Sequence, residues 1–216
     1  MTFKRAPAAL PAILAALAAC LGLALLSLAA TQSVAAGFDR ALLAFFAARR
    51  GPQADAFFLA VTWLGSSFVL MPAAITVVAA LAARGRWAAA GLAGLTYFGA
   101  SLTTWLLKLS IGRERPALFP SLPDVAPTDW SFPSGHATHA AAFALAAWLL
   151  LHERRSRWRW PAFVALGGLA LLVGASRLHL QVHWPTDVLA GLLVAGFWAG
   201  VALIVTHRGV APKEGT

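Results

Sequence analysis

The sequence has 216 residues, of which 60% are hydrophobic and only 12% are charged, and its mean hydropathy is +0.74. A soluble domain is about 45–50% apolar and about 25% charged, so this composition excludes disorder and a conventional soluble enzyme. Cys20 is the only cysteine, which excludes an internal disulfide bond. The net charge is +9, but the basic residues stand in small groups between apolar runs, and we therefore expect no nucleic acid partner.

Six apolar runs approach the length of about 20 residues that a membrane-spanning helix needs. They cover residues 9–30, 67–83, 87–108, 136–151, 161–178 and 186–206. The predicted fold is therefore all-α, an integral membrane bundle of six transmembrane helices. We expect a single domain over residues 1–216, with its core at 37–207.

The first run, residues 9–30, also allows two other interpretations, a cleaved signal peptide or a lipoprotein signal that ends at Leu17–Cys20. The apolar core of a signal peptide has about 7–15 residues, and this run is longer. The residues that follow Cys20 also stay apolar, where a mature lipoprotein would become polar. We therefore predict a retained membrane span.

The Lys and Arg residues between the runs indicate the orientation. With a cytoplasmic N-terminus, ten of them lie on the cytoplasmic side and seven on the opposite side, and four of those seven belong to motifs described below. The positive-inside rule then predicts that both termini are cytoplasmic. We expect a multi-pass protein of a bacterial inner membrane.

Two segments are expected on the outer side. Residues 37–52 alternate apolar and charged side chains at helical spacing. This pattern predicts an amphipathic helix that lies in the membrane interface, although a connecting loop with one helical turn fits it as well. Residues 109–135 contain five prolines, which predict an ordered, turn-rich lid.

The first polar motif, residues 108–116, pairs Lys108 with Arg115 seven positions later. If the helix continued, both cations would lie on one face, and Pro116 would end the helix soon after. Two cations at a membrane boundary suit a phosphate group. Taken alone, the motif also fits side chains that reach from a helix end toward the headgroups.

The second motif, residues 132–136, opens the fourth run. Ser134 is a suitable N-cap, Gly135 would let a ligand approach the backbone, and His136 would lie in the first helical turn. The free N–H groups of such a helix start can bind an anion. A capped helix with an incidental histidine is the other interpretation.

The third motif, residues 176–187, contains Arg177, His183 and Asp187. An Asp that accepts a hydrogen bond from one imidazole nitrogen leaves the other nitrogen free to attack an electrophile. A structural His–Asp pair fits the same spacing. His179, His183 and Asp187 would form a metal-binding stripe on a continuous helix, with His136 and His139 as further ligands, but Pro185 interrupts the helix and argues against that site.

The order of these motifs, Lys-x6-Arg-Pro, Pro-Ser-Gly-His and Ser-Arg-x5-His-x3-Asp, resembles the lipid phosphate phosphatases. That superfamily, the type 2 phosphatidic acid phosphatases, has a phosphate pocket similar to that of vanadium haloperoxidases. The motifs match without a substitution, and the six-helix plan extends the resemblance over most of the chain.

The resemblance implies a role for each motif residue. His183 would be the nucleophile that forms a phosphohistidine, Asp187 would orient it, and His136 would act as general acid and then as general base. The residues expected to hold the phosphoryl oxygens are Lys108, Arg115, Ser134, Gly135 and Arg177. The scheme implies no metal and no cofactor.

The sequence thus predicts a membrane enzyme that hydrolyses a lipid phosphate or pyrophosphate on the extracytoplasmic face, with membrane lipids as its other partners. Undecaprenyl pyrophosphate ranks first, but phosphatidic acid, phosphatidylglycerophosphate and a lipid A phosphate carry the same reactive group. A lipid-linked phosphotransferase of the superfamily, or a non-catalytic lipid-binding or transport protein, is the alternative. Two histidines in opposite protonation states predict a bell-shaped activity profile over about pH 5–7.5. The sequence makes no prediction of oligomeric state.

Overall fold

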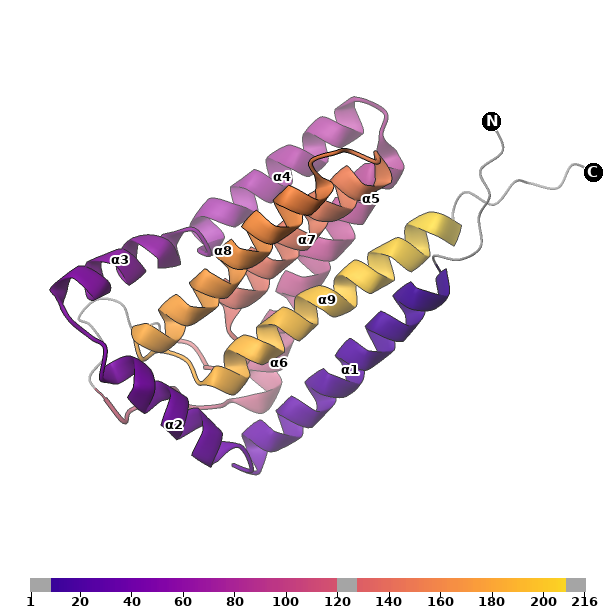
Figure 1. Ribbon diagram of the computed structural model, residues 1–216. Helices are drawn as coiled ribbons and strands as arrows, with labels where there is room; N and C mark the ends of the chain where they lie inside the picture. Colours follow the sequence, from indigo (N-terminus) through magenta and orange to yellow (C-terminus); the bar gives the residue numbers. More distant parts are fainter. Residues whose placement is uncertain (1–8, 120–127, 209–216) are drawn as a thin grey trace, which may run out of the picture.

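The computed structural model describes residues 9–119 and 128–208, and every regular element within these ranges is a helix (Figure 1). In chain order the elements are α1 (Ala9–Thr31), α2 (Ala36–Ala47), α3 (Pro52–Trp63), α4 (Ser67–Ala83), α5 (Trp87–Gly94), the π-helical turn η1 (Leu95–Gly99), α6 (Ala100–Ile111), α7 (Gly135–Glu153), α8 (Arg159–His179) and α9 (Pro185–Arg208). Several residues used above lie outside the described ranges, namely Lys4, Arg5 and Lys213 of the charge count and Pro120, Pro123 and Pro127 of the expected lid.

Four helical stretches are long and apolar enough to cross a membrane. They are Leu10–Thr31, Pro52–Ala83, Arg159–His179 and Pro185–Thr206. The other two predicted spans correspond to α7 and to the continuous helix formed by α5, η1 and α6, which fall outside these four. The all-helical fold is therefore as predicted, with four stretches that meet the length and composition of a membrane span.

Helix α3 was not predicted, and it extends the second candidate span to Pro52. Its first residue is a proline, which suits the first turn of a helix because that position needs no N–H donor. Its apolar residues are spread around the helix instead of forming one stripe, so the sequence lacks the periodic signal of an amphipathic helix.

Small residues let the long helices approach closely. Helix α1 packs along α9, and α7 packs against both α8 and α9 (Figure 1). At the α1–α9 contact, a Cβ on Gly200 would lie 2.9 Å from the Cβ of Ala16 and 3.1 Å from the carbonyl oxygen of Ala12, so the absence of a side chain on Gly200 lets the two helices approach closely. The buried face of α7 consists largely of alanine.

The end of α6, the start of α7, the end of α8 and the start of α9 lie at the same end of the bundle (Figure 1). Helix α2 lies across this end and packs against α8 and α9, with Leu43 fully buried. The turns that join α4 to α5 and α7 to α8, which contain Arg84, Arg86, Arg154 and Arg155, lie at the opposite end. The three polar motifs are therefore brought together by helix ends.

The helix does not continue from Lys108 to Arg115, as an arrangement of both cations on one helical face would require. Helix α6 ends at Ile111, because Gly112 adopts a left-handed conformation with φ of 59° and its N–H bonds to the carbonyl of Lys108. Glycine takes this conformation without steric cost, so the chain turns away before Pro116 is reached. Helix α9 begins at Pro185, one residue before the predicted run 186–206.

Gly191 on α9 offers a direct test of how tightly the start of α7 packs. A Cβ there would lie 2.8 Å from the carbonyl oxygen of Ser134 and 2.9 Å from Oγ1 of Thr138, whereas a Cβ on Gly196 would meet nothing within 4 Å. Gly191→Ala should therefore lower the free energy of unfolding by about 1–3 kcal/mol, the usual cost of overpacking. The thermal unfolding midpoint in detergent measures this, with Gly196→Ala as the matched control. Equal midpoints for the two variants would contradict the packing described here.

Candidate active site

A cavity of about 250 Å³ lies where the motif-bearing helix ends meet. Its walls include Lys108, Arg115, Gly135, His136 and His183, which are five of the eight residues expected to bind or transform phosphate. Ser67, Ser101, Thr104, Trp105, Asp129 and His139 complete the wall. The three other expected residues, Ser134, Arg177 and Asp187, are buried.

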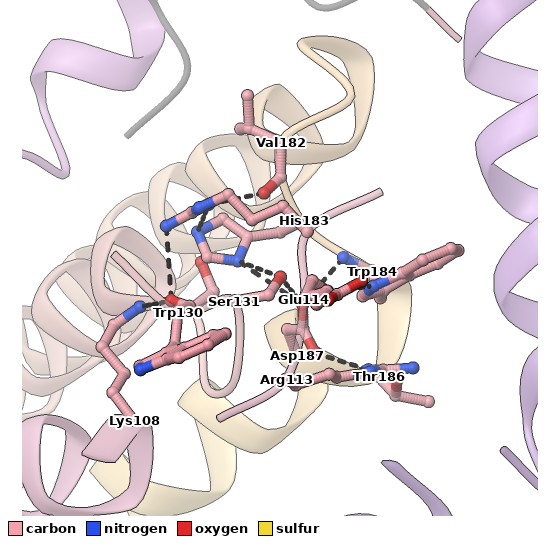
Figure 2. Close-up of polar contacts among 12 residues, drawn as sticks. Lys108, Arg113, Glu114, Trp130, Ser131, Val182, His183, Trp184, Thr186 and Asp187 are labelled. Carbon is pink, nitrogen blue, oxygen red and sulfur yellow. Dashed lines mark hydrogen bonds and ion pairs between the residues drawn. The ribbon is translucent and has the colours of Figure 1, made fainter. Parts of the chain in front are cut away.

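His183 lies in the short connection between α8 and α9, with different partners on its two ring nitrogens (Figure 2). Nδ1 lies 3.3 Å from Oγ of Ser131 and 3.5 Å from Oδ2 of Asp187, while Nε2 lies 3.1 Å from Nη1 of Arg115. A guanidinium can only donate, so Nε2 is the acceptor and the proton belongs on Nδ1. Nε2 thus carries the unprotonated lone pair, which accepts from Arg115 at the cavity wall and would leave Arg115 to attack an electrophile.

Burial lowers the pKa of the His183 imidazole well below its usual range, and the positive charges of Arg115, Arg177 and Lys108 lower it further. A buried cationic imidazole among three other cations would be unfavourable, so the neutral ring is the stable form at neutral pH. The neutral ring is also the form that can act as a nucleophile.

Asp187 lies fully buried in the first turn of α9, and both carboxylate oxygens are hydrogen-bonded. Oδ2 accepts from the backbone N–H of Trp184 at 2.9 Å and from the hydroxyl of Ser131 at 2.5 Å. Oδ1 accepts from Nη1 of Arg113 at 2.5 Å (Figure 2). The backbone carbonyl of Asp187 accepts from the N–H of Ser134 at 2.9 Å, which links the start of α9 to the start of α7.

Lys108 and Arg115 both pair with the carboxylate of Asp129, although Lys108 is in α6 and Arg115 is in the segment after it. Nζ of Lys108 lies 3.0 Å from Oδ2 of Asp129, and Nη2 of Arg115 lies 2.6 Å from Oδ1. Lys108 also donates to the carbonyl of Trp130, and Arg115 donates to the carbonyl of Val182 at 2.5 Å. The two cations thus converge on one anionic group in the cavity wall.

Burial of the Asp129 carboxyl opposes its ionisation, but the charges of Lys108 and Arg115 outweigh that effect and hold its pKa below the ordinary value. Asp129 is therefore an anion where the sequence predicts a phosphate. Its side chain is 54% exposed, so it can leave the cations without breaking a packed interior.

Arg177 and Ser134 are buried with polar atoms that lack partners in the part of the chain that the structure describes. Nη1 of Arg177 donates to Oγ1 of Thr62 at 2.6 Å, but its Nε has no acceptor. Ser134 precedes α7, as an N-cap residue does, yet its hydroxyl makes no capping bond and is unpaired. Buried polar groups are nearly always hydrogen-bonded. Ser134 directly precedes the cavity residue Gly135, and Arg177 is near enough to lower the pKa of His183, so both unpaired groups are suited to a ligand.

His179 does not join His183 and Asp187, as the alternative metal stripe would require. His179 Nε2 lies 2.7 Å from Oδ1 of Asp55 on α3, whereas His183 faces Arg115 and Asp187. His139 lines the cavity and stacks on Tyr97. Within residues 9–119 and 128–208, no group of three histidine, cysteine or acidic side chains is arranged to hold a metal ion.

Four residues of the site were not predicted from the sequence. Three of them contact a motif residue directly, namely Ser131, Arg113 and Asp129, and the fourth, Asp39, contacts Arg113. Arg113 and Ser131 lie within or beside the motifs, so their position was a usable signal. Asp39 is a lone acidic residue in an apolar segment, which is a second signal, since a buried acid needs a partner.

Residues 87–210 match the model of the PAP2 superfamily, and this range contains all three motifs. This chain belongs to the PAP2 superfamily. The match covers more than half of the sequence and leaves out α1 to α4.

Comparisons with individual proteins extend the likeness beyond residues 87–210. Phosphatidylglycerophosphatase B of Bacillus subtilis is 33% identical over 76% of this chain and 78% of that protein. The crystal structure of a transmembrane PAP2-type phosphatidylglycerolphosphate phosphatase from Bacillus subtilis matches with a TM-score of 0.77 and 27% identity, over 92% of this chain and 98% of that one. An undecaprenyl-diphosphatase of Sulfolobus acidocaldarius is 38% identical over 40% of this chain and 39% of that protein.

Asp129 should compete with a phosphate ligand in this PAP2 protein. Asp129→Asn removes the anion that pairs with Lys108 and Arg115 but keeps the size of the side chain. We expect inorganic phosphate to bind about fivefold more tightly, since partly exposed ion pairs contribute up to about 1 kcal/mol. Isothermal titration calorimetry measures the affinity, with Glu114→Gln as a control that removes an exposed acid nearby. Unchanged or weaker binding by Asp129→Asn would contradict the competition.

Proposed function

We propose that this PAP2 protein hydrolyses a lipid phosphate or pyrophosphate through a phosphohistidine at His183. The observation that carries this proposal is the geometry of the His183 imidazole, which contacts Ser131 and Asp187 on its Nδ1 side and faces a cationic cavity on its Nε2 side. Nucleophile, orienting carboxylate and cations are then all present before a substrate binds. Such a preorganised arrangement is the main source of catalysis in phosphoryl transfer.

In the first step, Nε2 of His183 attacks phosphorus and the bond to the leaving oxygen breaks. His136, which lines the same cavity, gives its proton to that oxygen. In the second step, His136 takes a proton from water, the water oxygen attacks phosphorus, and the P–N bond breaks to release phosphate. Asp187 stabilises the Nδ1 proton throughout.

The phosphoryl oxygens would be held by two kinds of group, cations that pair with an exposed carboxylate and buried donors that have no partner within the described residues. Lys108 and Arg115 exchange Asp129 for phosphate, and the unpaired Nε of Arg177 and hydroxyl of Ser134 donate as well. The backbone N–H of Gly135, at the start of α7, is the last donor. Three cations balance the charge of the phosphate without a metal ion.

We infer a six-span arrangement in which α1, α4, α5 to α6, α7, α8 and α9 cross the membrane as one domain over residues 1–216. The end with Arg84, Arg86, Arg154 and Arg155 would face the cytoplasm, since basic residues gather there without a chemical role. The cavity, at the other end, would then open on the extracytoplasmic side of an inner membrane, with both termini in the cytoplasm.

The acyl or prenyl chain would run along apolar side chains next to the cavity. Trp105 and Leu106 on α6 are exposed, as are Phe38 and Phe45 on α2, so this surface suits lipid. Helix α2 would lie at the outer membrane interface. The relatives are named for phosphatidylglycerophosphate and undecaprenyl diphosphate, so both are test substrates here.

Phosphate release should depend on His183 and not on a divalent metal. We expect purified protein in detergent with excess EDTA to release phosphate from undecaprenyl pyrophosphate or phosphatidylglycerophosphate. His183→Ala should lower kcat by about 10³-fold or more, as loss of a nucleophile does. His152→Ala, which changes a histidine at the far end of α7, is the matched control. Release that EDTA abolishes would overturn the metal-free mechanism.

The acid limb of the pH profile should lie lower than an ordinary histidine would place it. His183 attacks when neutral, and its lowered pKa keeps it neutral as the pH falls through the usual value of about 6.5. Lys108→Gln removes one of the charges that lower this pKa, so its limb in kcat/KM should move to higher pH. Ionisation of the substrate phosphate is the same for both proteins and cancels in the comparison. A limb that stays in place would contradict the assignment of His183.

A further inference from the structure

Arg113 joins two buried carboxylates that come from different helices. Its Nη1 lies 2.5 Å from Oδ1 of Asp187 on α9, and its Nη2 lies 2.7 Å from Oδ2 of Asp39 on α2. Both carboxylates are fully buried. The guanidinium is a planar fork, so it fixes the two acids relative to one another in direction as well as in distance.

Asp39 also binds the first turn of α9. Its Oδ1 accepts from the backbone N–H of Thr186 at 3.0 Å, and its Oδ2 accepts from the hydroxyl of Thr186 at 2.8 Å. The first N–H groups of a helix have no partner within the helix, and a carboxylate there is favourable. A residue of α2 therefore supplies the cap that α9 would otherwise take from its own sequence.

The partners of Asp187 divide between its two oxygens. Oδ1 is held by Arg113, whereas Oδ2 faces Nδ1 of His183 and accepts from Ser131 and Trp184 (Figure 2). The two oxygens are rigidly related through one carbon atom, so a hold on Oδ1 determines the direction of Oδ2. Arg113 thus sets the orientation of the oxygen that faces His183.

Helix α2 is held to the same region at a second point. Gln181, in the connection that carries His183, donates from Nε2 to the carbonyl of Leu43 at 3.2 Å. Leu43 itself is fully buried against Leu178 and Val188. The α2 helix therefore contacts both the segment that carries His183 and the turn that carries Asp187.

We propose that Arg113 and Asp39 are positioning residues for the reaction, which hold Asp187 in the orientation that serves His183 and so make α2 a part of the active site. This proposal rests on the proposed function, because it gives Asp187 its role there. Both terminal nitrogens of Arg113 are already paired with carboxylates and Asp39 is itself an acid, so neither residue is expected to contact the phosphate.

The test compares kcat and KM for phosphate release by Arg113→Gln, Arg113→Lys and Asp39→Asn. We expect Arg113→Gln to lower kcat by about 10- to 100-fold, less than the roughly 10⁴-fold typical of losing a triad aspartate, with KM within about threefold of the wild-type value. Arg113→Lys should recover only part of the loss, because an ammonium cannot hold both acids as a fork. Asp39→Asn should lower kcat in the same way. A raised KM with unchanged kcat would overturn the proposal, because it would mean that Arg113 binds substrate.

A double-mutant cycle separates positioning from a general effect on folding. If Arg113 acts through Asp187, then Arg113→Gln should cause no further loss of kcat in an Asp187→Asn background. A full additional loss in that background would overturn the proposal. Arg40→Gln and Glu114→Gln, which change exposed charges beside Asp39 and Arg113, are the matched controls and should keep wild-type kcat.

The same assay distinguishes this proposal from the proposed function. Wild-type protein and His183→Ala report on the phosphatase mechanism, whereas Arg113 and Asp39 variants report on positioning. Wild-type kcat in both Arg113→Gln and Asp39→Asn, with loss of activity in His183→Ala, would overturn the positioning role alone.

Discussion

The carboxylate of Asp187 is the group on which the arrangement of this site depends. It lies in the first turn of α9, fully buried, and it is bonded to the backbone of Trp184 and to the side chains of Ser131 and Arg113. An uncompensated carboxylate at this depth would be strongly unfavourable, so its partners are a condition for the fold as much as for the chemistry. Three separate segments of the chain meet around this one charge.

The site also concentrates positive charge. Lys108, Arg115 and Arg177 lie near His183, and their mutual repulsion favours a bound anion. In the free protein Asp129 supplies that anion for two of them, and the same repulsion keeps His183 neutral. In the proposed mechanism the cations therefore serve substrate binding and nucleophile activation together, and the exposed side chain of Asp129 balances part of their charge in the free protein.

The all-helical fold was predictable because long apolar runs are a local signal, and the structure brings five of the eight expected site residues to the wall of one cavity. Prediction failed where the outcome depended on one backbone angle or on a distant partner. The left-handed Gly112 ended α6 before Arg115, and the burial of Asp39 against Arg113 and Thr186 joined residues more than 70 positions apart. The helix α3 lacked any periodic pattern that would have revealed it. Contacts of this kind arise only once the helices are packed.

The bond from the N–H of Ser134 to the carbonyl of Asp187 connects the two helix starts through main-chain atoms alone. Its geometry is therefore independent of which side chains cover the outside of α7 and α9. If the site works as proposed, the outer surfaces of the bundle can change in sequence, and with them the hydrocarbon chain that is accepted, while the groups that would bind phosphate keep their spacing. One small fold can thus accept different lipids while its phosphate chemistry stays the same.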